Sequence, residues 1–160
     1  MPRTSTRLRQ QERLHRLDVG FERLRRLWES SLLRTRFHQR LGVQVEAGVV
    51  RTLRAVANSG SEAGVREVAA AMSVDASTAS RLVEQAVAAG YLQRSTPPAD
   101  RRRSVLALTP SGADLLERAN RIREEVLTEL TAGWSDEDVE QLAQLLARLA
   151  ARLDEMERRA

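Results

Sequence analysis

The middle of the chain carries polar side chains whose types and spacing suit contacts with nucleic acid. Short hydroxyls can bond phosphate oxygens or base edges, and an Arg or a side-chain amide can reach bases in the major groove. At 3.6 residues per turn they mark the outer face of a predicted helix from Asp75 to Ala89. The candidate DNA contacts are Ser77, Thr78, Ser80, Arg81 and Gln85. An ordinary solvated helix face has a similar composition, so this helix alone leaves both interpretations open.

A basic loop follows that helix and favours the DNA-binding interpretation. It joins two runs that can pair as strands, Tyr91–Ser95 and Ser104–Leu108, and Pro97 and Pro98 stiffen it. Adjacent arginines in the loop concentrate positive charge suited to a phosphate backbone or a minor groove. These are Arg101, Arg102 and Arg103. A run of charged residues is usually only a solvated surface. On a hairpin that follows two helices joined by a turn, such a run is more often a binding surface.

Two short helices joined by a turn must position the polar face. Val65–Met72 is predicted to be the first helix and Ser73-Val74 the turn, and Asp75 is a suitable N-cap for the second helix. Gly90 should end the second helix as its C′ residue. Its buried side is predicted to be Ala79, Leu82, Val83 and Ala86. Helix, turn, helix and basic hairpin form the plan of a winged helix-turn-helix, whose second helix enters the major groove.

Helices are also predicted before this region. A long helix with an apolar seam from Leu14 is expected to end near Gly42, and a second helix should run from about Val45 to Asn58. Gly64-Val65 is expected to form a short first strand of the winged sheet.

Two more helices are predicted after the wing. Thr109 should cap a helix from Pro110 to about Ala132, which Gly133 breaks. Ser135, with Asp138 three residues on, marks the start of the last helix.

The long helices at both ends carry more apolar surface than one small winged domain can cover. A two-fold homodimer would bury this surplus and place two recognition helices ~34–36 Å apart, matching an inverted repeat in DNA. The expected fold class is therefore mainly α, a winged helix-turn-helix with long N- and C-terminal dimerisation helices and a small β-wing. Residues 1–44 form the N-terminal dimerisation helix, 45–109 the DNA-binding domain and 110–160 the C-terminal dimerisation helices, within one compact unit.

The composition excludes several classes of function. The 160 residues are 42% hydrophobic but only 3% aromatic, as expected of helices packed through Leu, Val and Ala, and there is no Cys for disulfide or thiol chemistry. No apolar run approaches the ~20 residues of a membrane helix and no signal peptide is visible, so a cytoplasmic protein is expected. Residues 1–40 carry eleven Arg against four acidic residues, whereas residues 110–160 carry seven Arg against twelve.

No constellation of catalytic residues is visible, so neither an enzyme nor a cofactor is expected. The sequence has no Gly-rich phosphate loop, no His-Glu-x-x-His motif and no Ser, His and Asp trio in a recognisable context. Both histidines, His15 and His38, fall in the predicted first helix more than six turns apart. A metal site would have to recruit carboxylates from elsewhere, so no metal is expected.

Several runs around the predicted wing match a known family. Asp100, one residue, Arg102, five residues and Leu108-Thr109, followed by Pro110-Ser111-Gly112, resemble the wing signature of the MarR family of bacterial transcriptional regulators. Similar runs are Glu67-Val68-Ala69, Ser77-Thr78-Ala79-Ser80-Arg81-Leu82-Val83 and Ala89-Gly90-Tyr91-Leu92. The resemblance covers roughly residues 64 to 116. One departure is Ser73, where the family usually has Gly in the turn.

The resemblance implies roles for particular residues. The wing Asp and Arg of the family act together, which implies that Asp100 buttresses the loop and that Arg102 reaches DNA. It also implies a small-molecule pocket between the dimerisation helices and the winged domain. Candidates for its wall are Trp28, Arg34, Phe37 and His38, where the Arg could pair with an anionic aromatic ligand. The aromatic residues could equally belong to the core, and the Arg could be a surface charge.

The expected function is a homodimeric, MarR-type DNA-binding transcriptional regulator. A repressor on an inverted-repeat operator, released by a small anionic or aromatic ligand, is the expected form. A winged-helix module that only binds other proteins is the alternative from another class, and it would bind no DNA at any salt concentration. An enzyme is the weaker alternative, because no catalytic constellation appears.

Overall fold

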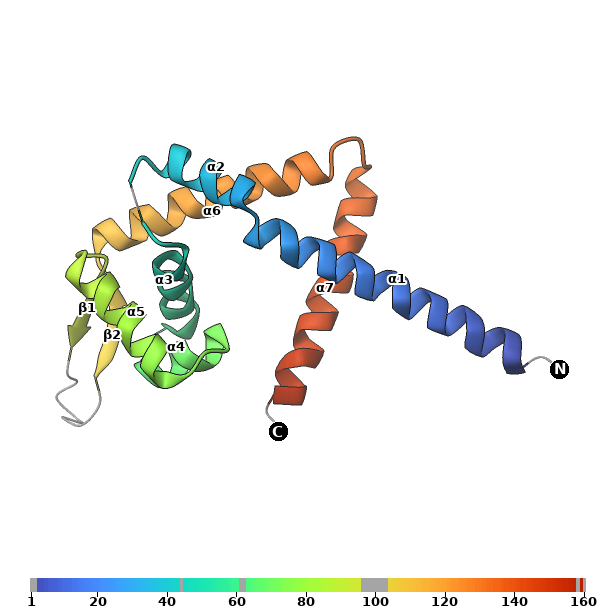
Figure 1. The fold of residues 1–160 in the computed structure, drawn as a ribbon, viewed down its shortest axis with the longest axis horizontal. Coiled ribbons are helices and arrows are strands. Elements are labelled where there is room, and N and C mark those ends of the chain that lie inside the picture. The colour runs from blue at the N-terminus through green and yellow to red at the C-terminus, as the bar shows by residue number, and fades with distance from the viewer. Residues whose placement is uncertain (1–2, 44, 61–62, 96–103, 158, 160) are drawn as a thin grey trace. The chain divides into compact units, whose positions relative to one another are not determined.

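The computed structural model describes the chain except residues 1–2, 44, 61–62, 96–103, 158 and 160 (Figure 1). The described residues form seven helices and one antiparallel pair of strands. In chain order these are α1 (Arg3–Glu29), α2 (Ser31–Leu41), α3 (Ala47–Ser59), α4 (Val65–Met72), α5 (Ala76–Ala88), β1 (Leu92–Ser95), β2 (Val105–Leu108), α6 (Pro110–Leu130) and α7 (Asp136–Glu157). The mainly α fold with a small β-wing is therefore confirmed.

The chain divides into two compact units, residues 1–120 and 121–160. The division falls inside α6, whereas the predicted divisions fall at residues 44/45 and 109/110. The predicted domain boundaries, and the single compact unit, stay predictions.

The core of the first unit lies among α3, α4, α5 and the two strands. Each of these helices is amphipathic, because its apolar residues recur every three or four positions. Fully buried side chains come from each of these helices and from β2: Leu53 from α3, Val68 from α4, Val83 from α5 and Leu106 from β2. The strands pair in the register that sets Leu92 opposite Leu108 and Ser95 opposite Val105.

Helix α4 and the turn after it match the predicted bounds. α5 also matches, with Asp75 as its N-cap. The four residues predicted to face inward from α5, Ala79, Leu82, Val83 and Ala86, are all buried. α3 begins and ends within two residues of the predicted helix.

The prediction of a single long N-terminal helix from Leu14 to Gly42 is wrong, because the helix is interrupted at Ser30. Ser30 has extended backbone angles, φ −67° and ψ 148°. Its hydroxyl donates to the Leu27 carbonyl at 2.7 Å and accepts from the Leu33 amide at 3.3 Å. A serine hydroxyl that bonds the neighbouring backbone competes with helix continuation and caps a new helix instead. The N-terminal part is therefore two helices, α1 and α2.

The predicted strand at Gly64-Val65 is also wrong. Gly64 is the N-cap of α4, and its amide donates to the Glu67 carboxylate at 3.0 Å, one half of a capping box. Val65 is already the first helical residue. The neighbouring residue does touch the sheet, because the Leu106 amide donates to the Ala63 carbonyl at 2.7 Å. In the described part of the chain, the sheet therefore has two strands, with Ala63 bonded beside β2.

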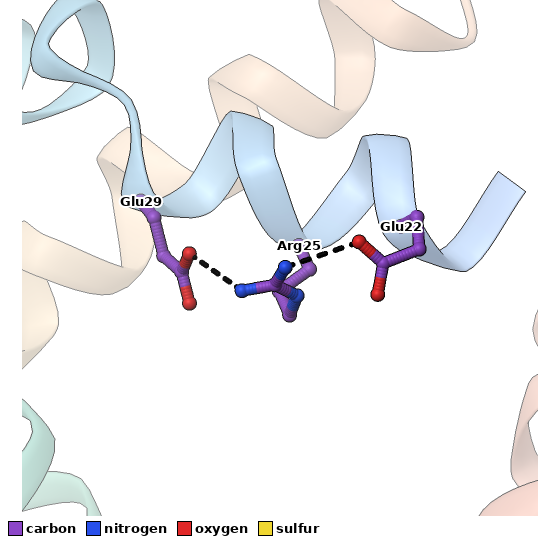
Figure 2. A network of polar contacts seen from close by, with 3 residues as sticks. All are labelled: Glu22, Arg25 and Glu29. Atoms are coloured by element: carbon purple, nitrogen blue, oxygen red, sulfur yellow. Dashed lines mark hydrogen bonds and ion pairs between the residues drawn. The ribbon is translucent and has the colours of Figure 1, made fainter. Parts of the chain in front are cut away.

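An exposed ion-pair network follows the outer surface of α1 (Figure 2). Arg25 donates to Glu22 at 3.0 Å and to Glu29 at 2.9 Å, one turn before it and one turn after it. The Arg25 guanidinium lowers the pKa of Glu22, first through the hydrogen bond and then through its charge. All three side chains are more than half exposed, so solvent screens the network and it supports the helix only weakly.

Both terminal helices leave apolar residues in solvent. The α1 seam exposes Leu14, Leu17, Phe21 and Leu24. The α7 seam is 37–58% exposed along its whole length, at Val139, Leu142, Leu145, Leu146, Leu149, Leu153 and Met156. Helix α7 itself begins as predicted: the Ser135 hydroxyl donates to Asp138 at 2.8 Å and accepts from its amide at 3.2 Å.

Ser73 occupies a backbone conformation that favours glycine. Its φ of 53° makes it the one described residue other than glycine with a positive φ. It ends α4 as a C′ residue, with the Ser73 amide bonded to Ala70 and the Val74 amide to Ala69. A serine can hold this turn, but the Cβ makes the left-handed conformation costly. The departure from the expected Gly therefore leaves the turn geometry intact.

We expect Ser73→Gly to stabilise the protein by about 0.5–1 kcal/mol. Glycine relieves the strain of the left-handed conformation, and this gain exceeds the cost of the larger conformational entropy that glycine gives the unfolded chain. The free energy of unfolding from urea titration is the measurement. Ser111→Gly, in the first turn of α6, is the matched control and should destabilise by about 0.5 kcal/mol. Destabilisation by both substitutions would contradict strain at Ser73.

Candidate nucleic-acid interface

The recognition helix candidate, α5, begins on a dense set of hydrogen bonds to Asp75. One oxygen of its carboxylate accepts from the Thr78 amide at 2.8 Å and also from the Ser77 hydroxyl. The other accepts from the Thr78 hydroxyl at 2.7 Å. The hydrogen bonds from Ser77 and then Thr78 hold the pKa of this carboxyl far below its usual range. Asp75 is therefore ionised throughout the physiological pH range.

The outward arc of α5 presents Ser77, Arg81 and Glu84. All three are exposed, and at 100° per residue they lie opposite the buried side of the helix. Ser80 is half-buried at the edge of this arc, where its hydroxyl donates to Glu84 at 3.2 Å. A cation, a hydroxyl and a carboxylate within two turns are suited to base edges, since together they provide both donors and acceptors.

Gln85 lies less favourably for DNA than the sequence suggested. The residue is half-buried, and its Oε1 atom is out of solvent with no hydrogen-bond partner among the described residues. It sits on the flank of α5, between the outward arc and the core. A base contact by Gln85 therefore needs a change of side-chain rotamer, and the contact stays a prediction, as do those of the other named residues.

The end of α5 is locked to the start of α6. Gly90, with φ 76°, ends α5 in a left-handed turn, and the Tyr91 amide bonds to Ala86 as a Schellman motif requires. The Thr109 hydroxyl donates to the Gly90 carbonyl at 2.6 Å and accepts from the Gly112 amide at 3.1 Å. One threonine therefore joins the recognition helix, the end of the wing and the N-terminus of α6.

Gly112 sits where no side chain fits. A Cβ built on it would lie 2.0 Å from the Tyr91 carbonyl oxygen, far inside van der Waals contact. The Thr109 amide bonds to the same carbonyl at 3.0 Å. The Pro-Ser-Gly end of the wing signature thus has a structural reason: it lets α6 approach the backbone that leaves α5.

Helix α3 holds the turn of the helix-turn-helix from behind. The Arg51 guanidinium donates to the Met72 carbonyl at 3.1 Å, at the end of α4. The buried Thr52 hydroxyl donates to Gly48 at 2.9 Å and lies 3.4 Å from the Met72 sulfur. Sequence reasoning missed Arg51, because its partner is a backbone carbonyl 21 residues away and no pattern marks it.

The wing arginines Arg101, Arg102 and Arg103, and the buttress Asp100, lie outside the described residues. The strands that lead to them are in place, since β1 and β2 pair antiparallel as predicted. Arg94 on β1 is an exposed cation on the approach to the wing that sequence reasoning did not select. The predicted wing contacts therefore stay predictions.

The residues proposed to line a ligand pocket lie on two helices. Trp28 is half-buried near the end of α1, and Phe37 is half-buried on α2. Arg34 and His38 are exposed on α2, one turn apart. The His38 Nε2 lies 3.2 Å from the Val45 carbonyl, so this nitrogen carries a proton and donates. One half of the candidate set therefore faces solvent, and the pocket stays a prediction.

The described residues hold neither a cluster of metal ligands nor a membrane-spanning helix. They contain no group of three or more His, Asp or Glu side chains placed to hold a metal ion. None of the helices in the described ranges is both long enough and apolar enough to cross a membrane.

Known proteins resemble this chain in sequence and in fold. Residues 41–103 match a sequence model of the MarR family. The HTH-type transcriptional regulator BilQ of Clostridium symbiosum is 32% identical over 84 residues, which cover 52% of this chain and 58% of that protein. The match thus spans somewhat more than half the length of this relative.

Solved structures extend the likeness over most of the chain. A MarR family protein from Bacillus stearothermophilus superposes with a TM-score of 0.68 at 20% identity, over 88% of this chain and 97% of that one. CouR from Rhodococcus jostii RHA1, bound to p-coumaroyl-CoA, superposes with a TM-score of 0.62 at 25% identity, over 83% and 92% of the two chains. The matched residues 41–103 contain α3, α4, α5 and β1, so the hydrogen bonds around Asp75 and Met72 lie within the match. The chain therefore resembles the MarR family in sequence over residues 41–103 and shares the fold of a solved MarR family protein.

Proposed function

We propose that the protein is a transcriptional regulator that binds double-stranded DNA through α5 and the wing. The observation that carries this proposal is the outward arc of α5, where Ser77 and Arg81 are exposed on a helix held firmly at both ends. Asp75 caps its start, and Thr109 bonds the carbonyl just past its end. A helix fixed in this way can present donors and acceptors to base edges without losing much conformational freedom.

The apolar seams of α1 and α7 support a homodimer. Seven apolar side chains of α7 are at least 37% exposed within one chain, and monomeric proteins rarely leave so long an apolar stripe in water. A second copy of the same chain covers such stripes by two-fold symmetry. Two copies of α5 would then read the two halves of an inverted repeat.

We further propose that the protein acts as a repressor and that a small ligand releases it from DNA. CouR, which shares the fold at 25% identity, has been solved with p-coumaroyl-CoA. The wall suggested here is Trp28, Arg34, Phe37 and His38, whose aromatic and cationic groups would suit an anionic aromatic ligand.

A binding titration against DNA tests the proposal. We expect the purified protein to bind DNA from upstream of its own coding sequence more tightly than random DNA. The logarithm of the affinity should fall with the logarithm of salt concentration by about 0.9 for each phosphate neutralised. Absence of binding to either DNA at low salt would favour the protein–protein module.

We expect Arg81→Ala to weaken binding to the preferred DNA by about 1–3 kcal/mol and to random DNA much less, because a bidentate contact to guanine is lost. Fluorescence anisotropy with both DNAs is the measurement. Arg148→Ala, on α7, removes the same charge away from α5 and should leave the preference unchanged. An equal loss on preferred and random DNA would assign Arg81 to phosphates instead.

A further inference from the structure

The hydroxyl groups at the start of α5 have a fixed direction. Ser77 and Thr78 both donate their hydroxyl protons to Asp75, the latter over 2.7 Å. An ionised carboxylate can only accept, so these two bonds have one possible polarity. The low pKa of Asp75 keeps the carboxylate charged. Each hydroxyl has a single proton, and in both residues that proton is already committed.

A committed hydroxyl cannot donate to a phosphate, whose oxygens are acceptors only. It still offers lone pairs, which need a donor opposite. In the major groove the donors on base edges are the amino groups of adenine N6 and cytosine N4. A phosphate near Ser77 would also lie near the negative charge of Asp75, and the two would repel. The Thr78 amide at the helix start is bonded to the same carboxylate, so it is not free to bind a phosphate.

We propose that Asp75 sets sequence specificity by making Ser77 a hydrogen-bond acceptor, so that Ser77 selects a base carrying a major-groove amino group, adenine or cytosine. Ser77 is exposed on the outward arc, one helical turn before Arg81. The inference rests on the proposed DNA binding and narrows it. It assigns Ser77 to a base edge, whereas the sequence alone leaves a serine hydroxyl equally suited to a phosphate. Asp75 acts through Ser77 as a positioning residue.

Selection of double-stranded DNA from a random pool by the unmodified protein supplies the probe. The selected half-site should contain one position that is restricted to adenine or cytosine and that loses its restriction with Ser77→Ala. We expect discrimination at that position to fall about tenfold, while affinity for random DNA changes less than about twofold. If Ser77→Ala weakens selected and random DNA equally, Ser77 bonds a phosphate and the proposal is overturned.

Two further measurements test whether the Ser77 hydroxyl accepts a hydrogen bond from the base or donates one to it. Replacing that base by its analogue without the amino group should weaken binding of the unmodified protein about tenfold, and should not affect Ser77→Ala. Asp75→Gly removes both acceptor oxygens and so frees both hydroxyl protons, and Gly is well tolerated at an N-cap. We expect this variant to tolerate guanine or thymine, which present acceptors, at the same position.

Asp138→Gly is the matched control, because Asp138 also bonds a capping hydroxyl, that of Ser135 at 2.8 Å. It changes the charge equally but lies in α7, so the base preference should not move. Thermal unfolding followed by circular dichroism confirms that each variant is folded, and the base analogue needs no protein variant at all. An Asp75→Gly protein with unchanged preference, or an analogue without effect, would overturn the proposal. Failure of the unmodified protein to enrich any DNA would instead refute the proposed function.

Discussion

Gly112→Ala should destabilise the protein by about 3 kcal/mol or more. The added Cβ would lie 2.0 Å from the Tyr91 carbonyl oxygen, and that atom belongs to the backbone. A backbone carbonyl cannot rotate away as a side chain can, so α6 must move from the end of α5. The movement also strains the hydrogen bonds from Thr109 to Gly90 and from Gly112 to Thr109. Urea unfolding measures the loss, and DNA affinity should fall with it because the end of α5 and the wing lose a shared anchor.

Gly20→Ala is the control for the chemical change. Gly20 lies inside α1, and a Cβ there would meet no atom within 4 Å. The same substitution should therefore stabilise the chain by up to about 1 kcal/mol, through helix propensity alone. Opposite signs for the two variants would assign the Gly112 effect to the close approach. A Gly112→Ala protein as stable as the unmodified one would show that the contact with Tyr91 is not maintained in solution.

Leu149→Glu should abolish the proposed homodimer at micromolar concentrations. Leu149 is 41% exposed in the seam of α7, and a charge placed in an apolar interface has no partner to compensate its desolvation. A cost of about 3 kcal/mol or more raises the dissociation constant by at least about a hundredfold. Analytical ultracentrifugation measures the shift from dimer to monomer. Leu145→Arg, in the same seam, should act in the same way.

Ala151→Glu adds the same charge to the opposite face of α7. Ala151 is exposed and lies away from the leucine seam by the helical period. It should leave the dimer intact, so the contrast with Leu149→Glu tests the face of the helix rather than its charge. A dimer that survives deletion of residues 139–160 would place the interface elsewhere.

The helices of the winged domain could be predicted closely because local chemistry defines their ends. Asp75 bonds the free amide of Thr78, Gly90 takes the left-handed turn, and Thr109 accepts from Gly112. Each of these signals acts within four residues. The buried side of α5 followed from the helical period alone, and all four of its predicted residues are buried.

The two errors in secondary structure came from competing local interactions. The apolar spacing from Leu14 continues past Ser30, so periodicity favoured one helix, but the Ser30 hydroxyl bonds both Leu27 and Leu33 and divides it. A short strand was predicted at Gly64-Val65, but the Gly64 amide donates to the Glu67 carboxylate, and Gly64 is the N-cap of α4. In both cases hydrogen bonds between a side chain and the neighbouring backbone decided the structure against the predicted pattern.

The sequence by itself determined the helix-turn-helix, the wing strands and the polar set on the outer face of α5, because their signals are local and periodic. Only the tertiary structure decided which of those polar groups face solvent and which are already hydrogen-bonded within the protein. It placed Gln85 on a half-buried flank, brought Arg51 of α3 to the carbonyl of Met72, and set Gly112 against the backbone of Tyr91. These contacts join residues about 20 positions apart. Their partners are mostly main-chain atoms, which every residue possesses, so no residue pattern in the sequence could reveal them.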